Sequence, residues 1–207
     1  MINPSISWFE KFWLQSIEEM VFSNDAQKNI VKSWIDNETI PGNVLLSGPA
    51  GTGKSTLALI AIRKIVKNQA DLCRIKTRSV SDVDEKIAPF VQKKPVSSKC
   101  KMVYIEEIGR TSRQVSAQLK EGLMEKYQDS VAFICCTNHP KRIDNALLSR
   151  FTFQIEFKSD NIQDIKNRLE FILTQEKAQY DPDELVKFVT KNYKAGLRNL
   201  INSLHVS

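Results

Sequence analysis

Short runs of apolar residues recur along the chain, and polar or turn-forming residues bound each run. Continuous rather than alternating apolar character is typical of strands that are buried on both faces. Between the runs lie stretches with helical periodicity, such as residues 112–127, where Val115, Leu119 and Leu123 recur every fourth position. The pattern therefore predicts a parallel sheet covered by helices. Its expected strands are Val44–Leu46, Met102–Ile105, Val131–Cys136, Phe151–Ile155 and a less apolar fifth, Leu72–Ile75.

Three amphipathic helices follow the last strand. The serine and aspartate at 159–160 can cap the first helix, Asp181 followed by a proline starts the second, and Gly196 precedes the third. We therefore expect an α/β protein with a P-loop core over residues 1–157, in which helices flank a five-stranded parallel sheet. A small helical lid is expected over residues 158–207.

The composition is that of a soluble globular chain, with 42% hydrophobic and 26% charged residues among 207. No stretch approaches the ~18 apolar residues that a membrane span needs, and the first ten residues lack a charged start followed by an apolar run. We therefore expect no membrane partner and a cytoplasm-like compartment. A net charge of +6 favours two readings about equally, a polyanionic partner such as nucleic acid and a generally basic protein.

Cysteine and histidine spacing gives no sign of a metal site. The cysteines lack CxxC pairs and lie in or beside apolar segments, so we interpret them as buried thiols. The two histidines indicate neither a metal site nor a catalytic triad. These residues are Cys73, Cys100, Cys135, Cys136, His139 and His205.

The strongest motif is GPAGTGKS at residues 48–55, which fits the phosphate-binding pattern G-x-x-x-x-G-K-[ST]. A predicted strand precedes it and a helical run over residues 56–66 follows, which is the context that the motif requires. Lys54 is expected to reach the β- and γ-phosphates of ATP, and Ser55 to supply an oxygen to Mg²⁺. The alternative is a glycine-rich turn without a ligand, and a chance match to the pattern in a chain of this length is expected about once in a hundred. The predicted nucleotide-binding residues are Gly48, Pro49, Ala50, Gly51, Thr52, Gly53, Lys54, Ser55 and Thr56.

Two adjacent carboxylates end the strand KMVYIEE. A P-loop nucleotidase needs an acid at the end of a neighbouring strand for the Mg²⁺ shell and, for hydrolysis, a group that orients or deprotonates the attacking water. Adjacent residues at a strand end splay apart, so we assign Glu106 to the metal and Glu107 to the water. The alternative reading is two exposed glutamates at a strand terminus.

These motifs together resemble the AAA+ ATPases, and among them the clamp-loader subunits of the replication factor C small-subunit type and their bacteriophage equivalents. The resemblance runs over almost the whole chain. The matching segments are WFEKF (8–12), IPGNVLLSGPAGTGKST (40–56), IEEIGR (105–110), FICCTN (133–138), LLSRF (147–151) and AGLRNLINSL (195–204).

The resemblance implies roles for single residues. Asn138 would end the sensor-1 strand and contact the attacking water or the γ-phosphate. Arg150 would act in trans on the ATP of a neighbouring subunit, because it has no evident target in its own. Arg198, on the sensor-2 helix of the lid, would touch phosphate, and the segment at 8–12 would pack near the adenine.

The chain also departs from the family pattern. Trp13-Leu14 stands where the family has Arg-Pro, Glu106 stands where aspartate is usual, and Phe151 replaces a cysteine. The longer Glu106 side chain would hold the Mg²⁺ shell slightly displaced and so slow hydrolysis or abolish it. The sequence ends at Ser207, just after the expected lid, where clamp-loader subunits continue into a helical collar, so it is either a fragment or a short relative that assembles differently.

The function implied by the resemblance is an ATP-hydrolysing subunit of a DNA-replication clamp loader. Its partners would be other clamp-loader subunits in an oligomer, of five by family analogy, together with a sliding clamp and primer-template DNA. Two alternatives stay open: a non-hydrolysing ATP-binding adaptor, and a loader or remodeller of a helicase or transposase. Location would be the cytoplasm of a bacterial or phage-infected cell, or the nucleus in a eukaryote.

Two basic groups are candidates for DNA contacts. One is an acid-free stretch before the carboxylate strand, for which a solvated loop is an equally good reading. The other lies beside the acidic pair and is the better candidate for coupling DNA to the site. The first comprises Lys93, Lys94, Lys99 and Lys101, and the second Arg110 and Arg113.

Overall fold

The structure is a computed structural model that describes residues 8, 12, 16–20, 22–76, 79–158 and 162–206, without the side chains of residues 205 and 206. Several sequence predictions fall outside these residues. They are the middle of the segment at 8–12, the Trp13-Leu14 departure, the helix cap at 159–160 and the side chain of His205.

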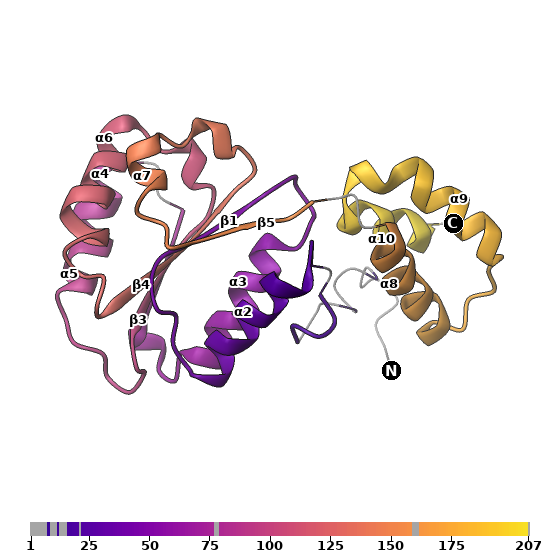
Figure 1. The fold of residues 1–207 in the computed structure, drawn as a ribbon, viewed down its shortest axis with the longest axis horizontal. Coiled ribbons are helices and arrows are strands. Elements are labelled where there is room, and N and C mark those ends of the chain that lie inside the picture. The colour runs from indigo at the N-terminus through magenta and orange to yellow at the C-terminus, as the bar shows by residue number, and fades with distance from the viewer. Residues whose placement is uncertain are drawn as a thin grey trace.

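Five parallel strands form a single sheet, in the order β2-β3-β4-β1-β5; Figure 1 shows this sheet between its covering helices. This confirms the predicted fold class. The strands are β1 (Val44–Ser47), β2 (Leu72–Ile75), β3 (Lys101–Ile105), β4 (Val131–Thr137) and β5 (Phe153–Glu156). The expected start of the last strand at Phe151 is wrong, because the backbone N–H of Phe151 donates to the Leu148 carbonyl at 3.1 Å and so closes the turn after a short helix.

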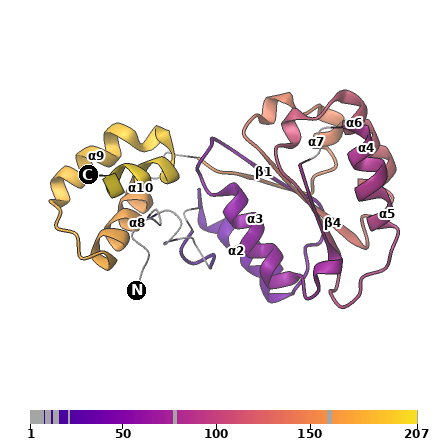
Figure 2. The same cartoon turned by 180° about the vertical axis from the view of Figure 1, so that it is seen from behind.

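Helices cover both faces of the sheet, as Figures 1 and 2 show from opposite sides. On one face lie α2 (Asp25–Asp36) and α3 (Lys54–Ile65). The other face carries α4 (Val80–Asp82), a π-helical turn η2 (Val83–Ile87), α5 (Ala88–Val91), α6 (Arg113–Ala117), the π-helix η4 (Gln118–Met124) and α7 (Asn145–Leu148). Short 3-10 turns are η1 (Gln69–Asp71), η3 (Ile108–Arg110) and η5 (Pro140–Arg142).

Successive residues of the central strands pack into two different cores. In β3, Tyr104 joins the core beneath α2 and α3, whereas Ile105 joins the core beneath α5 and α6, and both are fully buried. This alternation follows from the period of two in a strand. Because both faces are apolar, polar side chains that follow the strands can gather only at the ends of the sheet.

The helix expected over residues 112–127 is irregular. Ser112 caps it, with its hydroxyl accepting from the Val115 N–H at 3.2 Å, but the α-helix stops at Ala117 and a π-helix continues to Met124. The predicted apolar stripe is nevertheless buried. The periodicity therefore identified the buried face correctly but not the widened turns.

The three C-terminal helices, α8 (Ile162–Gln175), α9 (Pro182–Asn192) and α10 (Leu197–Val206), share a hydrophobic cluster of their own. Trp8 and Phe12 pack against this cluster. The turn η6 (Tyr193–Ala195) and Gly196 lead into α10, and the Arg198 N–H donates to the Gly51 carbonyl at 3.4 Å. The unit thus touches the phosphate loop, while its boundary near residue 157 stays a prediction.

Two buried charges lie where β2 and β3 begin, at the amino end of the sheet. The Asp71 carboxylate accepts from the N–H groups of Val96, Ser97 and Ser98 at 2.7, 3.1 and 2.9 Å. Lys101 donates to the carbonyls of Phe90 and Lys93 and is only 2% exposed. The DNA-binding reading is therefore wrong for Lys101, because its ammonium group is enclosed by the loop that it holds.

The cysteine interpretation is confirmed for Cys100, Cys135 and Cys136, which are buried, while Cys73 is half-buried. Among the described residues, no helix is long and apolar enough to cross a membrane.

Candidate nucleotide-binding site

The loop between β1 and α3 has the backbone shape of a phosphate cradle. Gly48 has φ +136°, and a Cβ there would lie 2.2 Å from the Phe157 carbonyl oxygen, so only glycine fits. At Gly196, with φ +84°, a Cβ would meet the Ala50 carbonyl oxygen at 2.5 Å. Because α3 begins at Lys54, the free N–H groups of its first turn face the space that the loop encloses.

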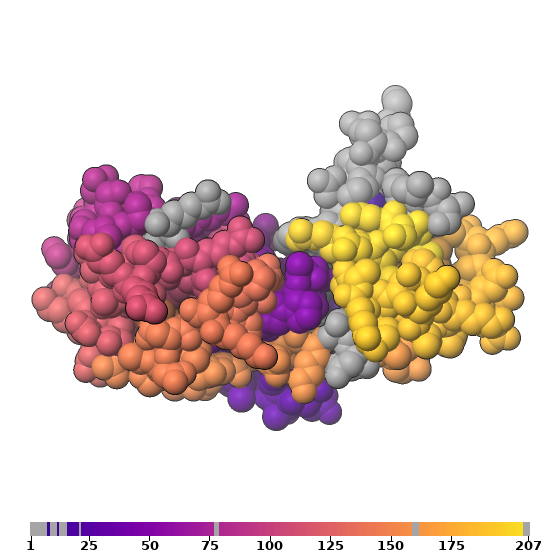
Figure 3. Space-filling model, turned by 90° about the horizontal axis from the view of Figure 1, so that it is seen from above, coloured from indigo at the N-terminus to yellow at the C-terminus, as the bar shows by residue number. Residues whose placement is uncertain are grey.

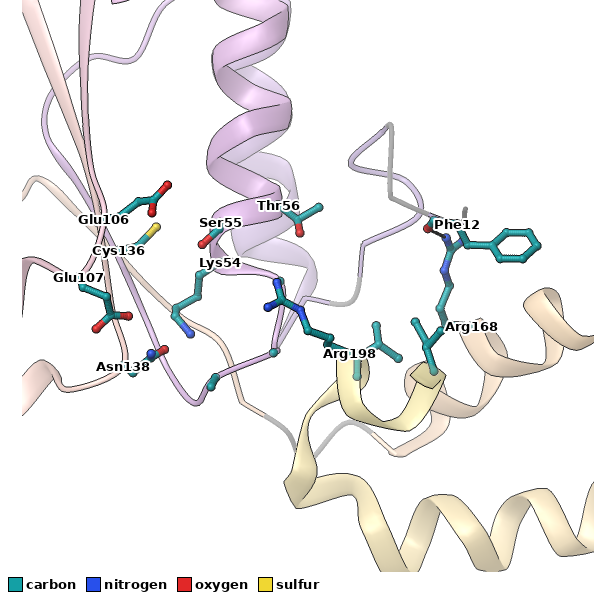
Figure 4. Close-up of a pocket in the computed structure, with 15 residues that line it drawn as sticks. Phe12, Lys54, Ser55, Thr56, Glu106, Glu107, Cys136, Asn138, Arg168 and Arg198 are labelled. Carbon is teal, nitrogen blue, oxygen red and sulfur yellow. Dashed lines mark hydrogen bonds between the residues drawn. The ribbon is translucent and has the colours of Figure 1, made fainter. Parts of the chain in front are cut away.

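A cleft of about 260 Å³ opens beside this loop, between the core and the helical lid (Figure 4). Seen from above in Figure 3, the purple surface around the loop lies between the orange part of the core and the yellow lid. The cleft brings together four groups of residues that are distant in sequence. They are the loop residues Ala50, Gly51, Gly53, Lys54, Ser55 and Thr56; the strand-end residues Glu106, Glu107, Cys136 and Asn138; the lid residues Arg168, Leu197, Arg198 and Ile201; and Phe12.

Lys54 is the central cation of the cleft. Its side chain is 5% exposed, extends toward Asn138 and Glu107 in Figure 4, and donates to the Pro49 carbonyl at 2.5 Å. Burial lowers the pKa of Lys54, while the nearby Cys136 and Glu107 act in the opposite direction. A desolvated ammonium group with a single backbone acceptor is a strong site for phosphate oxygens.

Glu107 adopts the left-handed backbone conformation, with φ +57° and ψ +48°, where the chain leaves β3 and turns into η3. One carboxylate oxygen, Oε2, is buried without a hydrogen-bond partner, and Arg110 Nε lies 3.9 Å from it. Such a backbone conformation costs of order 1–3 kcal/mol in a non-glycine residue. The geometry directs a carboxylate with spare acceptor capacity into the cleft.

Glu106 lies on the same strand end but is already paired. Arg74 Nη2 contacts its Oε1 at 2.6 Å, and Lys76 Nζ contacts its Oε2 at 3.1 Å. Burial would raise the pKa of the Glu106 carboxyl, but the hydrogen bonds and charges of Arg74 and Lys76 outweigh burial and hold this pKa below its usual value. Glu106 is therefore a carboxylate at neutral pH.

The oxygen donors present fit a magnesium ion. Mg²⁺ usually takes one or two protein oxygens and completes its shell with phosphates and water, and the Ser55 hydroxyl and the Glu106 carboxylate line the same cleft. Within the described part of the chain, no group of three or more His, Cys, Asp or Glu residues forms a closed metal site. A metal here would thus have to arrive with phosphate, and Glu106 would be shared with Arg74 and Lys76.

The match to known proteins agrees with this geometry. Residues 44–159 match the family described as "ATPase family associated with various cellular activities (AAA)". The chain belongs to this AAA family. The predicted class, a P-loop ATPase, is thereby confirmed, and nucleotide binding follows as a property of the family.

Individual relatives were found by sequence and by fold. The replication factor C small subunit of Methanothermobacter thermautotrophicus is 27% identical over 99% of this chain and 64% of its own length. A probable replication factor C subunit 5 of Caenorhabditis elegans is 28% identical over 97% of this chain and 57% of its own length. The Thermotoga maritima RuvB Holliday junction branch migration motor has a TM-score of 0.72 at 17% identity, with 94% of this chain and 64% of that one covered. The chain thus spans about three fifths of the length of these proteins.

One residue implied by the AAA resemblance lies away from the cleft. Arg150 does not line it, and its Nη2 donates to Glu125 Oε2 at 2.8 Å. Arg150 therefore has an ion-pair partner in its own chain, and its action on the ATP of a neighbouring subunit stays a prediction. Glu125 directly follows the π-helix η4. The Arg150 Nε is buried and has no hydrogen-bond partner.

Sequence reasoning missed several groups around the site. Tyr104 is fully buried, and its hydroxyl lies 3.8 Å from the Cys136 sulfur. Burial raises the pKa of Tyr104 and raises that of Cys136 to about 12, so both stay neutral behind the cleft. Tyr104 lies in β3 two positions before Glu106, which directly follows the strand, and this spacing could have indicated that the two side chains point to the same side. Arg168 gave no such signal.

Proposed function

We propose that the chain is an ATP-binding and ATP-hydrolysing subunit of a DNA-replication clamp loader, which uses ATP to load a sliding clamp onto primer-template DNA. The observation that carries this proposal is the gathering of the phosphate loop, Glu107, Asn138 and Arg198 around one cleft. The names of the relatives, replication factor C small subunits, support the specific task.

The residues divide the chemistry among themselves. Lys54 and the N–H groups of the loop would bind the β- and γ-phosphates. Glu107, with a free buried oxygen, would take a proton from the attacking water, and the neutral Asn138 amide would orient that water. Mg²⁺, held through Ser55 and Glu106, would neutralise charge on the phosphates. Arg198, on the lid, would contact phosphate and so connect lid position to the nucleotide.

Arg150 would act between subunits. It lies outside the cleft of its own chain, and the neighbouring Glu125 holds it in an ion pair that is open to solvent. Such a pair is worth only about 0–1 kcal/mol, so a neighbour's γ-phosphate could displace Glu125. We propose a partnership with other clamp-loader subunits, a sliding clamp and primer-template DNA, in the cytoplasm of a bacterial or phage-infected cell or in a eukaryotic nucleus.

Steady-state ATP turnover tests this function. The chain is assayed alone, with primer-template DNA, and with partner subunits and clamp added, beside Glu107→Gln. We expect turnover to rise with each addition and to vanish in the variant. The exposed Glu121→Gln is the matched control and should behave as the wild type. Turnover that responds to neither DNA, clamp nor partner subunit contradicts the proposal.

One observation favours a second candidate, an ATP-binding adaptor that does not hydrolyse. Both oxygens of Glu106 are engaged by cations, which competes with any role at the metal. Tight ATP binding with negligible single-turnover hydrolysis in the full assembly would establish this alternative.

A further inference from the structure

The end of the cleft farthest from Glu107 has a different character from the phosphate end. It is lined by the apolar residues Leu197 and Ile201 and by Phe12, whose ring points away from the cleft in Figure 4, and one cation, Arg168, lines it with them. In Figure 4, Arg168 rises from α8 toward the backbone of Phe12, on the far side of Arg198 from Lys54. Apolar walls with one polar group are the usual lining of a site for a flat organic ring.

The Arg168 guanidinium is fixed in place by two contacts. Its Nη1 donates to Glu19 Oε2 at 3.1 Å, and its Nη2 donates to the Phe12 carbonyl at 3.0 Å. The group also lies 5.1 Å from the centroid of the Phe171 ring, and the residue is 8% exposed. Arg168 therefore ties the lid helix to the segment that precedes the core.

One donor of this fixed group is unused. Nε of Arg168 is buried and has no hydrogen-bond partner. A buried donor without an acceptor costs roughly 1–3 kcal/mol, more when it is charged. The contacts with Glu19 and Phe12 account for Nη1 and Nη2 of Arg168, but no contact accounts for Nε. Arg168 also lines the ligand cleft.

We propose that Arg168 is a specificity-determining residue for the base of the bound nucleotide, with its Nε–H donating to a ring nitrogen of adenine that lies against Leu197 and Ile201 of α10. The proposal rests on the nucleotide binding proposed above. Adenine offers unprotonated ring nitrogens as acceptors and an apolar face for the walls. Because the Arg168 Nε is enclosed, the adenine ring nitrogen reaches it only when α8 and the segment at Phe12 shift slightly. Binding of the base is thereby linked to the position of the lid.

The test compares two probes, ATP and inorganic tripolyphosphate, which carries the phosphates without a base. Dissociation constants are measured for the wild type, Arg168→Met and two controls. Lys166→Met removes a cation from the same helix, and Glu19→Gln weakens the ion pair but leaves the Nε–H in place. We expect Arg168→Met to weaken ATP binding about tenfold, the size of one charge-assisted hydrogen bond, and to leave tripolyphosphate binding unchanged. Both controls should keep the wild-type preference for ATP.

A second measurement uses the wild type alone, so it does not depend on whether Arg168→Met folds. The probes are 1-deaza-, 3-deaza- and 7-deaza-ATP, each of which lacks one ring nitrogen. The wild type should bind one of the analogues about tenfold more weakly than ATP. If Arg168→Met folds, this variant should bind that analogue and ATP with equal affinity, because the hydrogen bond is already lost.

The outcomes separate the two proposals. Equal binding of all three analogues and ATP, or equal losses of ATP and tripolyphosphate in Arg168→Met, would overturn the role of Arg168 while nucleotide binding stands. A wild type that binds neither ATP nor tripolyphosphate would overturn the nucleotide site itself and this inference with it.

Discussion

Buried charges at the two ends of the sheet differ in how fully their atoms are hydrogen-bonded. At the amino end, Asp71 receives three backbone N–H groups and Lys101 donates to two carbonyls. At the carboxyl end, Glu107 keeps a buried oxygen without a hydrogen bond, and across the cleft Arg168 keeps an unused donor. A buried charge saturated by backbone groups holds the fold together, whereas one with an unfilled atom is available for a ligand.

The largest effect is expected at the carboxyl end. Glu107→Gln keeps the shape of the side chain but removes its basicity, so ATP turnover in the assembled complex should fall by roughly 10²–10⁴. The free energy of unfolding should stay the same or rise, because a carboxylate that lacks a hydrogen bond is lost. Turnover assays and urea denaturation of the same preparation measure both effects. A variant that loses stability along with turnover would place Glu107 among the structural charges.

Asp71 should show the reverse behaviour. Asp71→Asn replaces the acceptor of three N–H groups by an amide, and we expect a loss of about 2 kcal/mol in the free energy of unfolding with an unchanged dissociation constant for ATP. Urea denaturation measures the free energy of unfolding, and ligand titration measures the dissociation constant for ATP. The exposed Asp129→Asn is a matched control that should change neither quantity.

Because of Asp71, we also expect the free energy of unfolding to decrease at acidic pH. Burial would raise the pKa of Asp71, but the hydrogen bonds from Val96, Ser97 and Ser98 outweigh it and lower the pKa to about 2 from an ordinary 3.8. A depressed folded-state pKa gives stability that is present above the unfolded value and lost as pH falls. Wild-type stability should therefore decline between about pH 4 and 2, and Asp71→Asn should lack this part of the decline.

A smaller effect is expected at Glu106, which lines the ligand cleft but is also paired with Arg74 and Lys76. Removing Arg74 and Lys76 together by alanine frees both carboxylate oxygens, so Mg²⁺ should support ATP binding at concentrations lower by about threefold to tenfold, the worth of a partly exposed ion pair. A magnesium titration of ATP affinity measures this. Alanine at Lys93 and Lys94 makes the same charge change at the amino end and should have no effect. An unchanged magnesium requirement would show that Glu106 takes no part in the metal site.

The smallest effect is expected at the Arg150 ion pair. Glu125→Gln weakens the hold on Arg150, and ATP turnover of the assembled subunits should rise at most about fivefold, because an exposed pair contributes no more than about 1 kcal/mol. Glu121→Gln serves as the control. A fall in turnover would mean that Glu125 positions Arg150 for its neighbour instead of competing with it.

The sequence predicted what depends on local pattern. Apolar runs located the strands, and the motif GPAGTGKS located the loop, although α3 begins at Lys54 and not at the expected residue 56. The sequence pattern did not predict partners that are distant along the chain. Arg150 donates a hydrogen bond to Glu125, twenty-five positions away, and Arg168 donates one to Glu19, 149 positions away. Lys101 was misread as exposed because lysine is usually at the surface, and only the fold shows the loop that covers it.

The most direct test of the contrast compares thermal unfolding of wild type, Lys54→Met and Asp71→Asn, each with and without Mg·ATP. The account predicts that Lys54→Met keeps the wild-type midpoint without ligand and loses the increase that ligand gives. Asp71→Asn should unfold at a lower temperature but keep that increase. The opposite pattern, a destabilised Lys54→Met that still responds to ligand or an Asp71→Asn that no longer does, would contradict the division between structural and ligand-binding charges.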